Sequence, residues 1–117
     1  MLVRLDDPQL ARVRIIPGEI HLNVNGVIHG GAIASLIDVA LFAGSTMILG
    51  YNQVHAVTVE LNTHFLTPGD PKRPLDALVE VVRETGKMIF SRGKVVQDDN
   101  VVASYAGILR KFSPPSP

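Results

Sequence analysis

One long apolar run, residues 32–49, dominates the hydrophobic pattern of the chain. Its apolar side chains recur every three or four residues, as they do along a helix, and almost no polar residue marks an opposite side. We therefore expect a helix that the rest of the chain surrounds. The run is long enough to cross a membrane, but Asp38 lies near its centre and Gly44, Ser45 and Thr46 follow. These residues favour a buried core helix over a lipid-facing one.

After the helix, the pattern changes to alternating apolar and polar residues, which is typical of strands. Four such segments cover residues 55–66, 75–84, 88–97 and 101–112, with short turns at 85–87 and 98–100, and a shorter one at 10–16 precedes the helix. The alternation in 55–66 predicts one side made of Val57, Val59, Leu61 and Phe65, packed on the helix, and another made of Thr58, Glu60, Asn62 and His64. Because short turns make consecutive strands antiparallel neighbours, we expect an α+β fold, with an antiparallel five-stranded sheet wrapped around one long central helix.

Composition narrows the class of protein. With 117 residues, 46% of them hydrophobic, the chain can bury the core of one domain, which we expect to span residues 1–112. The Pro-rich end, residues 113–117, is expected to be a disordered tail. Equal numbers of acidic and basic residues, 11 of each, predict neither nucleic-acid nor membrane partners. The lack of cysteine excludes disulfides and a thiolate nucleophile, and together with a start that lacks an apolar signal segment it predicts a cytoplasmic protein.

Asp38 is the anomaly of the apolar run. An ionised carboxylate in apolar surroundings is costly unless it is hydrogen-bonded or paired, and within its own helix only Ser35 could donate to it. One interpretation is an aspartate near a surface, satisfied by water or backbone. The other is a buried carboxylate held for chemistry.

The helix is preceded by His29-Gly30-Gly31. Two glycines at a helix start let another group approach the backbone, whose unpaired N–H groups point outward at the positive end of the helix dipole. Such N–H groups suit a carbonyl oxygen that becomes negative during a reaction.

Other kinds of site fit the sequence less well. His21, His29, His55 and His64 lack the close spacing of a zinc motif, so no metal site is expected. Ser35 lies inside the expected helix instead of on an exposed turn, which argues against a Ser-His-Asp triad.

The residues at 23–38 combine into a more specific pattern, N-x-x-G-x-x-H-G-G followed by an aspartate. This pattern resembles the signature of hotdog-fold acyl-CoA thioesterases, and within them the subgroup of bacterial phenylacetyl-CoA thioesterases and related mitochondrial enzymes. The likeness continues through 57–62, 65–68, a basic turn at 83–87 and Val102-Ala103, and covers roughly residues 13–112. It implies the hotdog fold and the hydrolysis of an aryl- or fatty acyl-CoA to free acid and coenzyme A, without a cofactor.

The resemblance also assigns roles to residues. The backbone N–H of Gly30 would polarise the thioester carbonyl, Asp38 would act as nucleophile or general base, and Asn23 would orient water or substrate. His29 would support the loop, and the Thr58 hydroxyl would lie near the acid. Thr58, however, falls on the side of its strand that should face away from the helix, so only a twist, a bulge or a neighbouring chain would bring it to the site.

Substrate binding is expected from four further residues. The resemblance implies Gly31 near the substrate and Arg83, Gly86 and Lys87 near the phosphates of coenzyme A. The two basic residues are equally typical of ordinary solvated charges at a strand end.

The resemblance and the helix geometry both imply more than one chain. Gly30 and Asp38 lie eight residues apart, about 12 Å along one helix, which is too far for both to reach one thioester carbon. We therefore expect a homodimer with shared active sites, and the resemblance implies that dimers pair into a homotetramer. The main alternative function is a non-catalytic hotdog module that binds acyl-CoA or another acyl compound; the residue pattern of a hydratase is absent.

Overall fold

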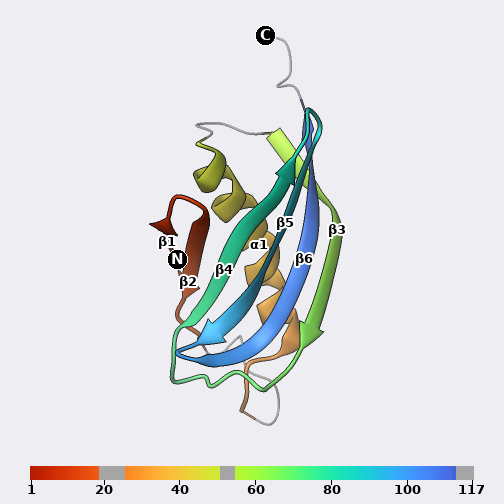
Figure 1. Ribbon diagram of the computed structural model, residues 1–117. Helices are drawn as coiled ribbons and strands as arrows, with labels where there is room; N and C mark the ends of the chain where they lie inside the picture. Colours follow the sequence, from red (N-terminus) through yellow and green to blue (C-terminus); the bar gives the residue numbers. More distant parts are fainter. Residues whose placement is uncertain (19–25, 51–54, 113–117) are drawn as a thin grey trace.

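The computed structural model describes residues 1–18, 26–50 and 55–112, which form one helix and six strands (Figure 1). In chain order these are β1 (Leu2–Asp7), β2 (Leu10–Ile15), α1 (Gly30–Leu49), β3 (His55–Phe65), β4 (Leu75–Glu84), β5 (Met88–Gln97) and β6 (Asn100–Phe112). The strands form one antiparallel sheet in the order β1-β2-β4-β5-β6-β3. The expected fold, a single long helix against an antiparallel sheet, is therefore confirmed.

The sheet has six strands instead of the expected five, because β1 adds an edge strand. It pairs with β2 through a tight turn at 8–9. Arg4, Asp6 and Asp7 interrupt its apolar alternation, and of its residues Val3 alone is partly buried. Because β1 covers little of the core, it can carry charges along its length, and its sequence therefore lacks the alternation of a strand. Such charges also protect the edge of a sheet from unwanted pairing.

The core lies between one side of α1 and the facing side of the sheet. Its largest fully buried side chains are Ile37, Leu41, Leu75, Ile89 and Leu109. The helix comes close to the sheet at Gly44, which has no side chain: a Cβ on Gly44 would lie 2.7 Å from Val79 Cγ2. The hydroxyls of Ser45 and Ser91 share a buried hydrogen bond of 2.7 Å between helix and sheet.

Both ends of α1 are capped. His29 lies at the N-cap, where its Nδ1 accepts a hydrogen bond of 2.9 Å from the Ala32 N–H. At the other end, Gly50 adopts a left-handed conformation (φ 76°) and its N–H turns back to the carbonyls of Thr46 and Met47. The helix therefore begins at the two glycines and ends at a glycine, as the sequence predicts.

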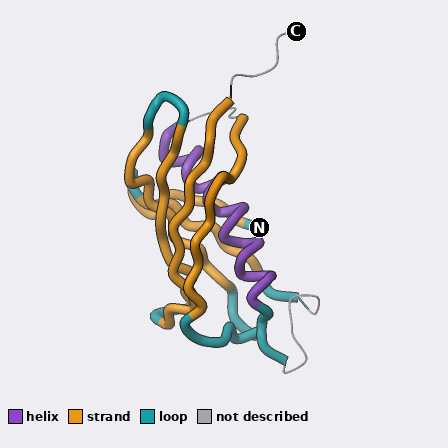
Figure 2. Tube along the Cα trace, turned by 90° about the vertical axis from the view of Figure 1, so that its right-hand side faces the viewer, coloured by secondary structure: helices purple, strands orange, loops and turns teal. Residues whose placement is uncertain are grey.

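The expectation that the chain surrounds α1 is wrong for a single chain. The sheet covers one side of the helix, and the other side is open (Figure 2). Val39 and Phe42 are 44% and 38% exposed and lie in a stripe that also contains Asp38, and Met47, near the end of the helix, is 37% exposed. In length and composition α1 could cross a membrane, but 44% of its most apolar stretch is buried inside the fold. Apolar residues thus line both the covered and the open side, which the sequence alone cannot distinguish.

The expected sides of β3 are also corrected. The pairing of β3 with β6 shifts between Thr58 and Glu60, which marks a β-bulge. An extra residue reverses the side to which the following residues point. Ala56 and, after the bulge, Leu61 pack against the core, whereas Val57 and Val59 are about half exposed, 50% and 49%.

Candidate active site

The carboxylate of Asp38 lies in the middle of α1, on its open side. It is exposed in the single chain, so of the two interpretations of Asp38 the structure of one chain shows an aspartate at the surface and not a buried one. The Thr58 hydroxyl of β3 donates a hydrogen bond of 2.6 Å to Asp38 Oδ1. Among the described residues, Thr58 is the one hydrogen-bond donor to this carboxylate, which leaves Oδ2 accessible to a substrate or water.

The bulge in β3 explains how Thr58 reaches the helix. Before the bulge, even-numbered residues face α1, so Ala56 packs on the core and Thr58 meets Asp38. The alternation read from sequence put Thr58 on the opposite side because it could not include an extra residue. Of the three ways considered for bringing Thr58 to the acid, the structure shows the bulge.

Gly30 begins α1 at the end of the molecule opposite to the helix C-terminus (Figure 1). The first N–H groups of a helix have no partner within the helix. In the described part of the chain, no acceptor hydrogen-bonds to the Gly30 N–H. The Phe65 ring packs against this glycine: a Cβ added to Gly30 would lie 3.4 Å from the nearest ring carbons. The His29 cap and the Phe65 ring thus hold an exposed N–H donor at the positive end of the helix dipole. The sequence predicts that Phe65 faces the helix but gives it no role in this site.

The single chain does not bring all the expected site residues together. Gly30 and Asp38 lie on the same helix, eight residues or about 12 Å apart. Gly31 is exposed beside them, and Asn23 lies outside the described residues.

Arg83, Gly86 and Lys87 are exposed around the β4–β5 turn. This turn lies at the end of the sheet where α1 finishes, far from Gly30 of the same chain (Figure 1).

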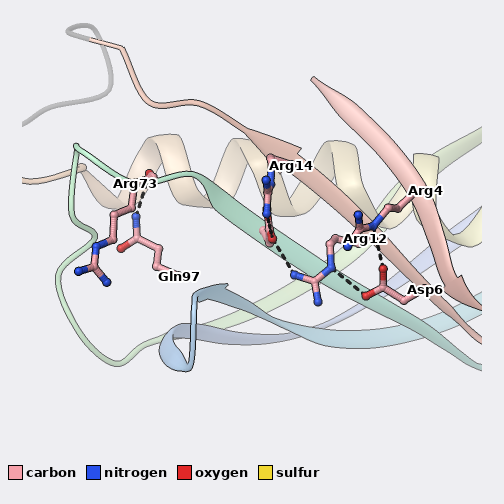
Figure 3. Close-up of polar contacts among 7 residues, drawn as sticks. Arg4, Asp6, Arg12, Arg14, Arg73 and Gln97 are labelled. Carbon is pink, nitrogen blue, oxygen red and sulfur yellow. Dashed lines mark hydrogen bonds and ion pairs between the residues drawn. The ribbon is translucent and has the colours of Figure 1, made fainter.

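A second polar cluster lies on β1, β2 and β4, and its charged side chains pair with one another (Figure 3). Asp76 is 5% exposed and accepts hydrogen bonds from Arg12 (2.6 Å) and Arg14 (2.7 and 2.9 Å), while Arg12 also pairs with Asp6. Burial acts to raise the pKa of Asp76, but the hydrogen bonds from Arg14 and Arg12 together outweigh it and hold that pKa below its usual value. Because each charge has a partner, this cluster holds strands together and is not a site for chemistry.

Two further observations concern an unpaired hydroxyl and possible metal ligands. The Thr63 hydroxyl of β3 is the one buried side-chain polar atom without a hydrogen bond in the part of the chain that the structure describes. Across residues 1–18, 26–50 and 55–112, no three His, Cys, Asp or Glu side chains come together as metal ligands.

Comparison with known families identifies the chain. The family model described as the thioesterase superfamily matches residues 25–104, which include Gly30, Asp38 and Thr58. The chain belongs to the thioesterase superfamily. No curated protein sequence matches it significantly.

Several solved structures resemble this thioesterase-superfamily chain. A conserved protein of Pseudomonas aeruginosa has a TM-score of 0.82 at 25% identity, over 94% of this chain and 86% of that one. A Bacillus halodurans protein solved with coenzyme A has a TM-score of 0.80 at 28% identity, over 97% and 75%. The PaaI protein of the Escherichia coli phenylacetic acid degradation operon has a TM-score of 0.77 at 25% identity, over 89% and 73%. The resemblance to the phenylacetyl-CoA thioesterase subgroup is thereby confirmed.

Proposed function

We propose that this chain is an acyl-CoA thioesterase that hydrolyses an aryl- or fatty acyl-CoA, with Asp38 as its catalytic carboxylate. The observation that carries the proposal is the hydrogen bond from Thr58 to Asp38 Oδ1 at 2.6 Å. It orients a carboxylate on the open side of α1, with the apolar side chains of Val39 and Phe42 beside it. Membership of the thioesterase superfamily and the likeness to a structure solved with coenzyme A support the same activity.

Two routes fit this carboxylate. As a general base, Asp38 takes a proton from water while the water oxygen attacks the thioester carbon. The carbonyl oxygen becomes negative and accepts from the Gly30 N–H, then the C–S bond breaks and the coenzyme A thiolate takes up a proton. As a nucleophile, Asp38 attacks the carbon itself, expels the thiolate and forms an anhydride that water then hydrolyses. A single turnover in ¹⁸O-water identifies the anhydride route if an unlabelled Asp38 oxygen appears in the acid, which happens when water attacks the Asp38 carbonyl carbon of the anhydride.

We further propose that each active site combines Asp38 of one chain with Gly30 of a second copy. Two helices packed antiparallel about a two-fold axis would bring these groups together and create two equivalent sites. The open stripe of α1, with Asp38, Val39 and Phe42, is the surface that such packing would cover.

Strand β3 supports the same arrangement. It is an edge strand of the sheet, and its Val57 and Val59 are half exposed. An exposed edge with apolar side chains is a surface on which a second copy can continue the sheet. Pairing of these dimers into a homotetramer, and a cytoplasmic location, remain predictions.

The basic turn gains a role in a dimer. Arg83 and Lys87 are exposed at the end of the sheet opposite to Gly30 of their own chain (Figure 1). Because antiparallel packing reverses the second copy, Gly30 of that copy would move toward this end. The two cations could then bind the phosphates of a coenzyme A whose thioester lies at the shared site.

The alternative, a non-catalytic module that binds acyl-CoA, predicts binding without turnover. Release of free thiol should be followed with a panel of aryl-, short- and long-chain acyl-CoA substrates. We expect turnover of at least one substrate, and a loss of about 10²–10⁴-fold in kcat for Asp38→Asn. Asp99→Asn, an exposed aspartate of the β5–β6 turn, is the matched control and should keep wild-type activity. Binding of acyl-CoA without release of thiol would favour the module.

A further inference from the structure

Gln97, the last residue of β5, is a buried side chain that belongs to no expected site. It is 3% exposed, and all three of its hydrogen bonds are made to one loop. Its Nε2 donates to the carbonyls of Asp70 (2.8 Å) and Arg73 (3.1 Å), and its Oε1 accepts from the Asp70 N–H (2.8 Å). Figure 3 shows the amide turned toward Arg73. Gln97 therefore fixes the loop that precedes β4.

That loop in turn holds the segment before α1. Gly69, adjacent to Asp70, accepts a hydrogen bond of 3.3 Å at its carbonyl from the Ile28 N–H. A Cβ on Gly69 would lie 3.0 Å from Ile28 Cδ1, so the two residues pack closely. Ile28 is 4% exposed and lies two residues before Gly30.

The remaining contacts of this region are more exposed. Arg73 pairs with Asp98 at 3.0 Å, but the two side chains are 56% and 78% exposed, so solvent screens the pair. Thr67 binds the Val101 carbonyl at 3.1 Å on the surface. The buried amide of Gln97, with both donors and its acceptor satisfied, is the more rigid support.

We propose that Gln97 is a positioning residue, which sets the place of the Gly30 N–H through Asp70, Gly69 and Ile28. This inference rests on the proposed function, in which that N–H stabilises the negative oxygen of the reaction. A donor displaced by about 1 Å loses strength in the transition state more than in substrate binding. Loss of Gln97 should therefore lower kcat and leave KM nearly unchanged.

The test compares variants of two equally buried residues of β5. Gln97→Met removes all three hydrogen bonds; Gln97→Glu keeps the size but turns an oxygen toward two carbonyl oxygens. Ser91→Ala is the matched control, because Ser91 is also 3% exposed and loses a buried hydrogen bond, with Ser45, on the core side. Measurements are kcat, KM, Tm and the exchange rate of the Ile28 N–H by NMR.

We expect kcat to fall about 10-fold or more in both Gln97 variants with KM within about twofold, and the Ile28 N–H to exchange faster. Ser91→Ala should lower Tm while kcat and Ile28 exchange stay at wild-type values. The proposal is overturned if Gln97→Glu keeps wild-type kcat, or if Ser91→Ala loses kcat equally.

Failure of the proposed function gives a different result. If the wild-type chain hydrolyses no acyl-CoA, the exchange measurement decides the positioning role alone. Unchanged Ile28 exchange in folded Gln97→Glu overturns it, and faster exchange in the Gln97 variants but not in Ser91→Ala supports it.

Discussion

At the scale of single residues, one hydroxyl holds the carboxylate of the proposed active site. Thr58 and Asp38 come from different elements, and neither has another described hydrogen-bond partner that would fix the pair. A hydrogen bond to a charged group contributes about 1.5–3 kcal/mol. Orientation of Asp38 should therefore affect catalysis measurably without deciding whether the chain folds.

Thr58→Val should lower kcat about 10-fold, because the variant keeps the branched shape and loses only the donor to Asp38. Thr58→Ser keeps the hydroxyl and should keep most of the activity. Steady-state kinetics on the best substrate of the panel provide the measurement. A Thr58→Val enzyme at the wild-type rate would show that the hydrogen bond has no part in catalysis.

The ion pairs of Asp76 should make the stability of the fold depend on pH. Because its pKa is held below the usual value, its ionised form stabilises the fold above the pKa of the unfolded chain, and this stabilisation is lost as the pH falls through the lower pKa of the fold. Asp76→Asn should cost about 2 kcal/mol at pH 7, since Arg14, 43% exposed, is partly screened by solvent. Urea unfolding from pH 7 to pH 2 should show a shallower acid loss in the variant. An equal slope in both proteins would contradict this assignment.

At the scale of elements, the close approach of α1 to the sheet depends on glycine. Gly44→Ala should destabilise the fold by about 1 kcal/mol, although alanine favours a helix, because the new Cβ would lie 2.7 Å from Val79 Cγ2. Combining it with Val79→Ala should recover about 1 kcal/mol relative to the sum of the single changes. Thermal unfolding of the four proteins measures this coupling. A Gly44→Ala protein more stable than wild type would show that the contact is not tight.

The elements also show how far sequence can predict this fold. The periodicities of 3.6 and 2 predict α1 and the strands from β2 to β6, because those residues bury one side. They miss β1, whose charged residues bury little. They reverse the sides of β3 as far as Thr58, before the bulge, because a bulge is a property of pairing with β6 and leaves no sign in the strand itself.

The site was predictable to a similar extent. Asp38 and Gly30 stand out because an acid and a glycine pair are unusual in and before an apolar helix. The sequence left open whether Asp38 is exposed, since apolar neighbours on a covered side of the helix and apolar neighbours on an open side look alike in sequence. Gln97 gives no signal at all, because its role depends on a loop more than 20 residues away in the chain.

At the scale of the whole molecule, the proposed function makes the single chain an incomplete active site. Its carboxylate is exposed, its N–H donor lies about 12 Å along the same helix, and apolar side chains remain open around both. A second copy would cover this surface and supply the missing group. The central claim is therefore that the site is shared between two chains.

Complementation between two inactive variants tests this claim most directly. Asp38→Asn removes the carboxylate, and Gly30→Pro removes the N–H donor at the first helical position, where proline is tolerated. His29 has a ψ of 153°, which suits the residue before a proline. The two variants are unfolded together, refolded, and checked for mixed dimers by native mass spectrometry.

A mixed dimer with shared sites holds one site with both groups intact, so an equal mixture should recover about one quarter of wild-type activity. The control is wild type mixed with the double variant Asp38→Asn/Gly30→Pro: its mixed dimers should be inactive if sites are shared and half-active if each chain builds its own. Recovery in the first mixture and none in the mixed dimers of the second is the result that the account predicts. No recovery in the first mixture despite mixed dimers, together with half-active dimers in the second, would contradict it.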